Sequence, residues 1–224
     1  RACGLGLVRQ PRPRALGPVM SELRVRLADP GGSDPEAIAR IYAPWVREST
    51  VSFELEVPSA STIAERIAAV RTFYPWLVLE RLGTSPEGGS VVAYAYATRL
   101  RARAAYDWVA ETSVYVAADE QARGLGRRIY STLLELLAAQ GLIWAYGAIA
   151  LPNPGSQRFH AQLGFEHVGR FPAVGFKHGQ WCDIDWWRKL LNPIVETPIA
   201  PRSMLDAELA PRVAEILGTT ATRS

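Results

Sequence analysis

The stretch VYVAADEQARGLGRRIY, residues 114–130, decides the fold. It passes from alternating apolar and β-branched residues, through charged residues, to two glycines and directly into helix-forming residues. This order predicts a strand, a tight loop around Gly124 and Gly126, and then a helix. Glycines at a helix start allow several unpaired backbone N–H groups to point at one anion, and the helix dipole adds to the attraction. The junction is therefore a candidate pyrophosphate site.

The spacing of the glycines excludes two common phosphate-binding motifs. A P-loop requires GxxxxGK[ST], and a dinucleotide fingerprint requires three glycines as GxGxxG, and neither surrounds Gly124. The loop instead reads QxxGxG, from Gln121 to Gly126. Two glycines at a helix start also form plain tight turns, and the motif alone leaves that alternative open.

Length and composition indicate one folded domain. The 224 residues are 48% hydrophobic and 21% charged, which fits one substantial core with an appended segment. We expect residues 1–19 to be a leader of vector-derived or upstream sequence, because no periodicity precedes Met20. Residues 20–191 then form the domain, and residues 192–224 form a proline-rich tail with a surface helix within MLDAELAPRVAEIL.

Charge and cysteine content limit the partners of the chain. The net charge of +3 rests partly on arginines of the leader, so we expect no nucleic-acid partner. Only Cys3 and Cys182 are present, which argues against a disulfide framework and a cysteine zinc site. No run approaches the ~18 apolar residues of a membrane span. We therefore expect a cytoplasmic protein with no metal and no membrane partner.

Hydrophobic periodicity predicts an alternation of strands and helices. Helices between strands require an α/β fold, with a mixed sheet covered by helices on both faces. Ser33 and Glu36 stand at capping-box spacing before a helix that would bury Ala37, Ile41 and Trp45 on one face. The expected strands are 23–27, 76–82, 90–98, 111–116, 143–150, 167–174 and 181–190, with helices at 33–46, 62–71, 124–139 and 156–165 and a short extended piece at 50–54.

Two motifs in this order resemble the GCN5-related N-acetyltransferase (GNAT) superfamily. QxxGxG matches its pyrophosphate loop, and NPGSQRFHAQLGF matches N-x-x-A/S-x-x-x-Y-x-x-x-G-F at Asn153, Ser156, Gly164 and Phe165. The resemblance implies a GNAT fold with about seven strands, mostly antiparallel and splayed between strands 4 and 5. It also implies acetyl-CoA as cosubstrate.

The prolines beside Asn153 give the splay a physical reason. Pro152 and Pro154 cannot donate to a strand ladder, so the strand must separate from its neighbour there. A gap between 112–116 and 143–150 would let a pantetheine arm bind as an added strand. Asn153 could also serve only as a turn residue.

Further stretches resemble the phosphinothricin N-acetyltransferase group. They are STVSFE, YPWLV, AYDWVAETSVYV and FKHGQWCD, and the resemblance spans about residues 22–191. It implies acetylation of the amino group of glufosinate or of an amino acid such as methionine sulfoximine, and a homodimer. Lys177 and His178 are shared with the group, but physics assigns them no role at this stage.

Acetyl transfer requires a base for the ammonium group of the substrate. Strand alternation puts Glu111 on the same face as Ser113 and Tyr115, and neighbouring apolar residues would raise its pKa. The resemblance implies that Glu111 is the base, whereas an acid at a strand end is otherwise usually solvated. Where the resemblance implies a tyrosine that protonates the leaving thiolate, this chain has His160, which is either that acid or a histidine packed under the sheet.

The same reasoning assigns residues to the two ligands. Arginines suit an anionic substrate, although a solvated basic loop explains each of them equally well, and aromatic residues beside a strand are often core. The expected substrate residues are Phe53, Arg101, Ala102, Arg103, Tyr106, Glu111, Thr112 and Ser113. The expected acetyl-CoA residues are Val114, Tyr115, Val116, Gln121, Ala122, Arg123, Gly124, Leu125, Gly126, Arg127, Asn153 and Ser156.

Other mechanisms and functions remain as alternatives. Cys182 has no neighbouring group that would activate it, so direct transfer is favoured over an acyl-enzyme. A peptide or protein N-terminal acetyltransferase would need an open groove. A non-catalytic acyl-CoA sensor would keep the loop, but the retention of Glu111 favours catalysis.

Overall fold

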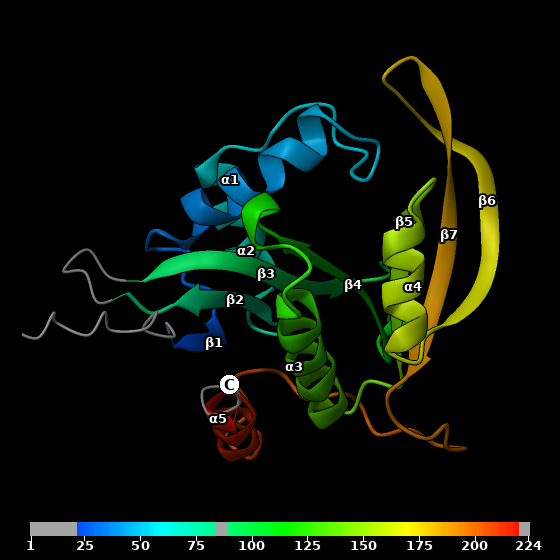
Figure 1. The fold of residues 1–224 in the computed structure, drawn as a ribbon. Coiled ribbons are helices and arrows are strands. Elements are labelled where there is room, and N and C mark those ends of the chain that lie inside the picture. Colours follow the sequence, from blue (N-terminus) through cyan, green and yellow to red (C-terminus); the bar gives the residue numbers. More distant parts are fainter. Residues whose placement is uncertain (1–21, 84–88, 220–224) are drawn as a thin grey trace, which may run out of the picture.

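The computed structural model describes residues 22–83 and 89–219, which build one mixed sheet with helices on both faces (Figure 1). The leader assigned to residues 1–19 lies outside the described residues. The seven strands lie in the order β1-β2-β3-β4-β5-β7-β6, and only β4 and β5 form a parallel pair among them. The strands are β1 (Leu23–Leu27), β2 (Trp76–Arg81), β3 (Ser90–Arg99), β4 (Val109–Val116), β5 (Trp144–Ala150), β6 (Glu166–Lys177) and β7 (Gln180–Leu190).

Two apolar clusters hold the helices against opposite faces of the sheet. One cluster joins the first two helices to one face and includes Ile38 and Ile67. The other cluster joins the third helix to the opposite face and includes Ile129 and Leu133. The α/β class is thus confirmed. The helices are α1 (Asp34–Arg47), α2 (Ala60–Val70), α3 (Leu125–Gln140), α4 (Pro154–Gln162) and α5 (Ala210–Thr219).

The predicted splay is present between β4 and β5. The two strands pair only from Val109 to Glu111 and from Trp144 to Tyr146. Beyond this point β4 stays paired with β3 up to Val116, and β5 stays paired with β7 up to Ala150. Each strand therefore keeps its outer neighbour while a gap opens between them, as the diverging ribbons show (Figure 1).

The start of α1 differs from the predicted capping box. Ser33 adopts a helical conformation and its side chain makes no capping hydrogen bond. The buried carboxylate of Asp34 instead accepts hydrogen bonds from Arg26 at 2.6 and 2.8 Å and from the Asp29 N–H at 2.8 Å. This charge pair fixes the helix start, so the capping box at Ser33 and Glu36 was wrong.

Two further local predictions need correction. The buried face of α1 includes Ile38, Tyr42 and Val46, whereas Trp45 is only partly buried. Residues 50–54 form bends and not a paired strand. Both differences arise because the chain between α1 and α2 crosses towards the β6–β7 hairpin instead of joining the sheet (Figure 1).

The chain after β7 packs back onto the domain. The Gln140 side chain donates to the carbonyls of Phe73 and Arg202 at 2.6 and 2.8 Å, and Leu209 and Ile216 are buried. The tail helix begins at Ala210, after a series of turns, and not at Met204. Residues 192–219 are therefore anchored to α3 through an apolar contact and side-chain hydrogen bonds.

Candidate functional site

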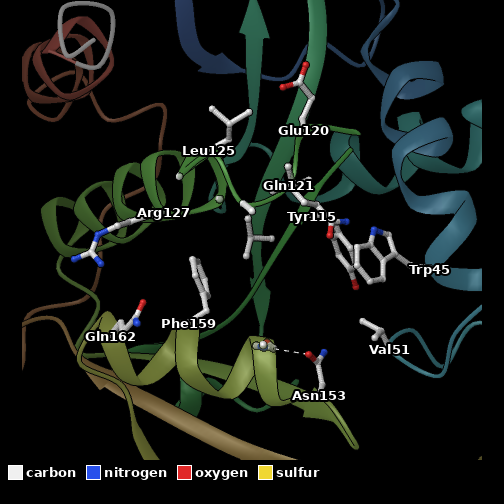
Figure 2. Close-up of a pocket in the computed structure, with 17 residues that line it drawn as sticks. Trp45, Val51, Tyr115, Glu120, Gln121, Leu125, Arg127, Asn153, Phe159 and Gln162 are labelled. Carbon is white, nitrogen blue, oxygen red and sulfur yellow. Dashed lines mark hydrogen bonds between the residues drawn. The ribbon is translucent and has the colours of Figure 1, made fainter. Parts of the chain in front are cut away.

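A cavity of about 570 Å³ lies where β4 and β5 part. Figure 2 shows Trp45 and Val51 on one side, Phe159 of α4 on the other, and Tyr115 of β4 between them. The loop before α3 closes one end. The complete lining is Trp45, Val51, Val114, Tyr115, Val116, Glu120, Gln121, Ala122, Gly124, Leu125, Gly126, Arg127, Asn153, Gly155, Ser156, Phe159 and Gln162.

The glycine loop has the geometry of an anion site. Gly124 caps α3 with φ of +77°, a left-handed conformation that glycine adopts readily. The first hydrogen bond of the helix runs from the Arg128 N–H to the Gly124 carbonyl at 3.1 Å. The three preceding amides, Leu125, Gly126 and Arg127, therefore have no acceptor within the helix and face the cavity end. Their dipoles favour a diphosphate.

Gly126 allows this helix start to approach the sheet closely. A Cβ at Gly126 would lie 3.3 Å from Cγ2 of Val116, which is tighter than ordinary contact. A larger residue would push the first turn of α3 away from β4. The two glycines thus have different tasks: Gly124 turns the chain, and Gly126 brings its amides next to the strand edge.

Asn153 has both of the roles considered from the sequence. It lines the cavity, and its Oδ1 accepts a hydrogen bond from the Ser156 N–H at 3.0 Å, which caps α4 (Figure 2). Because Oδ1 is engaged in the cap, a ligand contact by this side chain would use its Nδ2 group. The cap also holds the start of α4 at the open side of the gap.

All expected acetyl-CoA residues except Arg123 line the cavity. Arg123 is exposed and pairs with Glu120 at 3.0 Å. The sequence reasoning missed Trp45, Val51, Phe159 and Gln162, with Glu120 and Gly155. The periodicity of α1 suggested that Trp45 was core, and only the path of the chain after α1 places it at the cavity wall. Ligand contact by these residues stays a prediction.

Glu111 lies at the closed end of the gap, because it is the last β4 residue that pairs with β5. Burial raises the pKa of its carboxyl group, and the nearby Arg101 guanidinium opposes that shift. Among the described residues no hydrogen bond or ion pair engages this carboxylate. A half-buried carboxylate with a raised pKa is suited to accept a proton near neutral pH.

His160 is buried on the opposite face of the sheet and does not line the cavity. Its Nδ1 donates to the Ser156 carbonyl at 2.8 Å, and its Nε2 lies 3.4 Å from the Tyr130 hydroxyl. A Cβ at Gly147 would be 2.8 Å from Nε2, so the ring packs directly under β5. Burial lowers the pKa of His160. The geometry matches the packed-histidine alternative, and a direct role as acid is not supported.

The expected substrate residues fall into separate groups. Arg101 and Tyr106 line a second cavity, of about 310 Å³, together with Tyr146 of β5 and Trp186 of β7. The Arg101 guanidinium lies 6.0 Å from the ring centroid of Trp186. Ala102 and Arg103 are exposed and line neither this cavity nor the larger one.

Strand alternation separates Thr112 from Glu111 and Ser113. The Thr112 hydroxyl donates to the Tyr146 carbonyl at 2.9 Å and lies 2.7 Å from the Tyr130 hydroxyl of α3, so its side chain points away from the Glu111 face. Its assignment as a substrate side chain was therefore wrong. Ser113 stays on the Glu111 face, where it is the cross-strand partner of Tyr96. Phe53 packs against Gly175 of β6.

Within residues 22–83 and 89–219, no group of three or more His, Cys, Asp or Glu side chains could hold a metal ion. In the same residues, no helix combines the length and apolar character needed to cross a membrane.

Comparisons with known proteins agree with this geometry. A family model described as "Acetyltransferase (GNAT) domain" matches residues 30–186. A phosphinothricin N-acetyltransferase of Streptomyces viridochromogenes is 35% identical over 170 residues, covering 75% of this chain and 90% of that protein. An L-methionine sulfoximine/L-methionine sulfone acetyltransferase of Pseudomonas aeruginosa is 34% identical over 173 residues, covering 77% of this chain and 98% of that protein.

A solved structure shows the same architecture. The crystal structure of a GNAT superfamily phosphinothricin acetyltransferase from Sinorhizobium meliloti, in complex with AcCoA, superposes with a TM-score of 0.72. It is 29% identical in sequence, and the match covers 83% of this chain and 97% of that chain.

The burial of His160 predicts a measurable titration. In an NMR titration we expect the pKa of His160 to lie below the ordinary 6.5. Since the unfolded chain then binds the proton more tightly, the free energy of unfolding should decrease as pH falls below about 6.5 towards the folded pKa. His160→Gln should weaken this dependence. A His160 pKa at or above 6.5 would contradict the assignment.

Proposed function

The chain belongs to the GNAT acetyltransferase family, and on this basis we propose that it transfers the acetyl group of acetyl-CoA to the amino group of a small amino acid analogue. The substrate class is that of phosphinothricin or of methionine sulfoximine and sulfone, after which the relatives are named. The observation that carries the proposal is the position of Glu111 at the closed end of the β4–β5 gap.

The larger cavity fits acetyl-CoA in two parts. The unpaired amides of the first turn of α3 and the left-handed Gly124 suit the diphosphate. The β4 edge from Val114 to Val116, which has no strand partner on the β5 side, suits the pantetheine arm as an added strand. Bound acetyl-CoA supplies the thioester carbonyl carbon that an amine attacks.

Glu111 is the base in this proposal. The α-ammonium group of an amino acid is mostly protonated at pH 7, so the attacking nitrogen must first lose a proton. Glu111 stands three residues before Val114, roughly 10 Å along the strand, where a ligand lying in the gap would end. Its raised pKa brings the carboxylate closer to the basicity that proton transfer requires.

The acceptor amine is proposed to bind on the Glu111 face. Of the two predicted substrate arginines, Arg101 lines a cavity on that face, and its positive charge acts on the Glu111 carboxylate. A guanidinium suits the carboxylate or phosphinate group of the analogue. Ser113, Phe53 and Tyr106 complete the proposed acceptor environment.

Transfer is proposed to be direct, without an acyl-enzyme. Cys182 is buried, its Sγ lies 3.8 Å from the Gln180 carbonyl, and it lines neither cavity. A thiol in this position cannot reach a thioester in the gap. The position of this thiol away from both cavities supports attack by the substrate amine itself.

A change at Glu111 tests the catalytic proposal. Glu111→Gln should lower kcat/KM in a thiol-release assay by about 10²- to 10⁴-fold, because the proton acceptor is lost. The wild-type rate should fall as pH drops through the raised pKa of Glu111, and this acid limb should disappear in the variant. Panel substrates are glufosinate, methionine sulfoximine and methionine sulfone.

Two controls accompany this measurement. Acetyl-CoA affinity should be unchanged in Glu111→Gln, and Glu65→Gln, at an exposed site on α2, should leave kcat/KM unaltered. Undiminished turnover in Glu111→Gln would exclude Glu111 as the base. No turnover by the wild type with any panel amine would favour a non-catalytic acyl-CoA sensor.

The conformation of Gly124 gives a matched test of the loop. A Cβ at Gly124 or at Gly169 meets no atom within 4 Å, but only Gly124 has a positive φ. Gly124→Ala should weaken acetyl-CoA binding about five- to thirtyfold by calorimetry, since an alanine in this conformation costs about 1–2 kcal/mol. Gly169→Ala should bind as the wild type does. Equal affinities in both variants would argue against the loop as the diphosphate site.

We also propose that the protein is a cytoplasmic homodimer. Besides Leu190 at the end of β7, five large apolar side chains that are about half exposed or more lie on the β6–β7 hairpin, a surface that suits a second copy. The buried free Cys182 agrees with a reducing compartment. The apolar residues are Val168, Phe171, Val174, Phe176 and Trp181.

Light scattering tests the dimer. The wild type should have about twice the chain mass of 24.6 kDa, and Trp181→Asp should shift it towards the monomer because a charge would enter the interface. Ile199→Asp changes a side chain that is 90% exposed and off the hairpin, and it should keep the dimer. A monomeric wild type would refute the proposal.

A further inference from the structure

The connection between α1 and α2, residues 48–59, is held against the β6–β7 hairpin by a buried lysine. Lys177 is only 3% exposed, and its Nζ donates to the Ser52 carbonyl at 2.6 Å. The two residues are 125 positions apart in sequence. A buried ammonium group is costly unless it is hydrogen-bonded, so this contact fixes where Ser52 lies.

The hairpin presents the ammonium group from a rigid position. Lys177 is the last residue of β6 and pairs with Gln180 across a two-residue turn. His178 and Gly179 have φ of +51° and +76°, as in the tight turns that match the twist of a β-hairpin. The turn therefore sets the direction of the Lys177 side chain.

A second contact holds the next residue of the connection. Gly175 precedes Lys177 by two positions on β6, and the Phe53 ring lies directly against its backbone. A Cβ at Gly175 would overlap the Phe53 ring, so only glycine permits this approach. Lys177 and Gly175, two positions apart on β6, thus hold Ser52 and Phe53 in place.

The segment that contains Ser52 and Phe53 is connected through side-chain contacts to the wall of the larger cavity. The Ser52 hydroxyl lies 2.5 Å from the Tyr42 hydroxyl, and the Tyr42 ring packs edge-on against Tyr115 with centroids 5.0 Å apart. Tyr115 lines the larger cavity, as does Val51, which directly precedes Ser52. A shift of the segment would therefore change the site.

We propose that Lys177 is a positioning residue, whose ammonium group fixes Ser52 and Phe53 over the Glu111 face and so closes the acceptor side around a small amine. This inference rests on the proposed function for its kinetic consequence. The contacts that carry it are independent of that function. It gives a role to the lysine of FKHG that sequence reasoning could not assign.

A matched pair of variants tests the proposal. Lys177→Met keeps most of the side-chain length but removes the donor, and it should raise KM for the amine about tenfold, as expected for loss of a charged hydrogen bond that orders the site. Residues 49–57 should also exchange amide hydrogen faster. Lys189→Met removes a bond of the same 2.6 Å length, to the Leu163 carbonyl, and should change neither quantity.

The outcomes separate the inference from the proposed function. Unchanged amine KM and unchanged exchange in Lys177→Met, or equal changes in Lys189→Met, would overturn the positioning role. If Lys177→Met does not fold, Gly175→Ala displaces Phe53 while keeping the lysine, and an unaltered amine KM there would overturn it. If the wild type acetylates no amine, the function fails, but hydrogen exchange still decides whether Lys177 holds the segment.

Discussion

After Glu111 and Tyr146, β4 and β5 share no further ladder pairs, and the rest of the site depends on this separation. The Thr112 hydroxyl bridges to the Tyr146 carbonyl at the point of divergence, and the Tyr130 hydroxyl supports it from α3. His160 packs under Gly147 immediately beyond. The buried side chains of Thr112, Tyr130 and His160 thus occupy the space beneath the gap. The Thr112 hydroxyl satisfies the Tyr146 carbonyl, which continued strand pairing would otherwise satisfy.

The separation also divides the chemistry between two faces of the sheet. Glu111 and Arg101 belong to the face covered by α1 and α2, whereas Thr112 and His160 belong to the face covered by α3 and α4. A ligand that enters the gap passes between these faces. Glu111, the proposed base, is therefore kept apart from the buried hydrogen-bonded side chains beneath the gap, so the two can be altered separately.

Much of this arrangement could be predicted from short-range sequence patterns. The strand, glycine loop and helix around Gly124 depend on contiguous residues, because backbone conformation and helix-end amides are local properties. The missing proline N–H at Pro152 led us to expect a separation of the strands there, but the β4–β5 pairing already ends at Tyr146, six residues earlier. Side-chain contacts were less accessible: Thr112, expected among the substrate residues, turns its hydroxyl towards Tyr130 and the Tyr146 carbonyl, and the capping box at Ser33 gave way to an ion pair of Asp34 with the distant Arg26.

The sequence by itself determined the order of elements and the strand, glycine loop and helix of residues 114–130, since each is encoded by neighbouring residues, whereas Glu111 became the candidate base through the resemblance to the phosphinothricin N-acetyltransferase group. Only the tertiary structure decided that Trp45 and Val51 line the cavity, that His160 is buried, and that Lys177 donates a hydrogen bond to the Ser52 carbonyl. These facts require residues far apart in sequence to meet. Packing and the burial of charge select such contacts, and no local pattern along the chain records them.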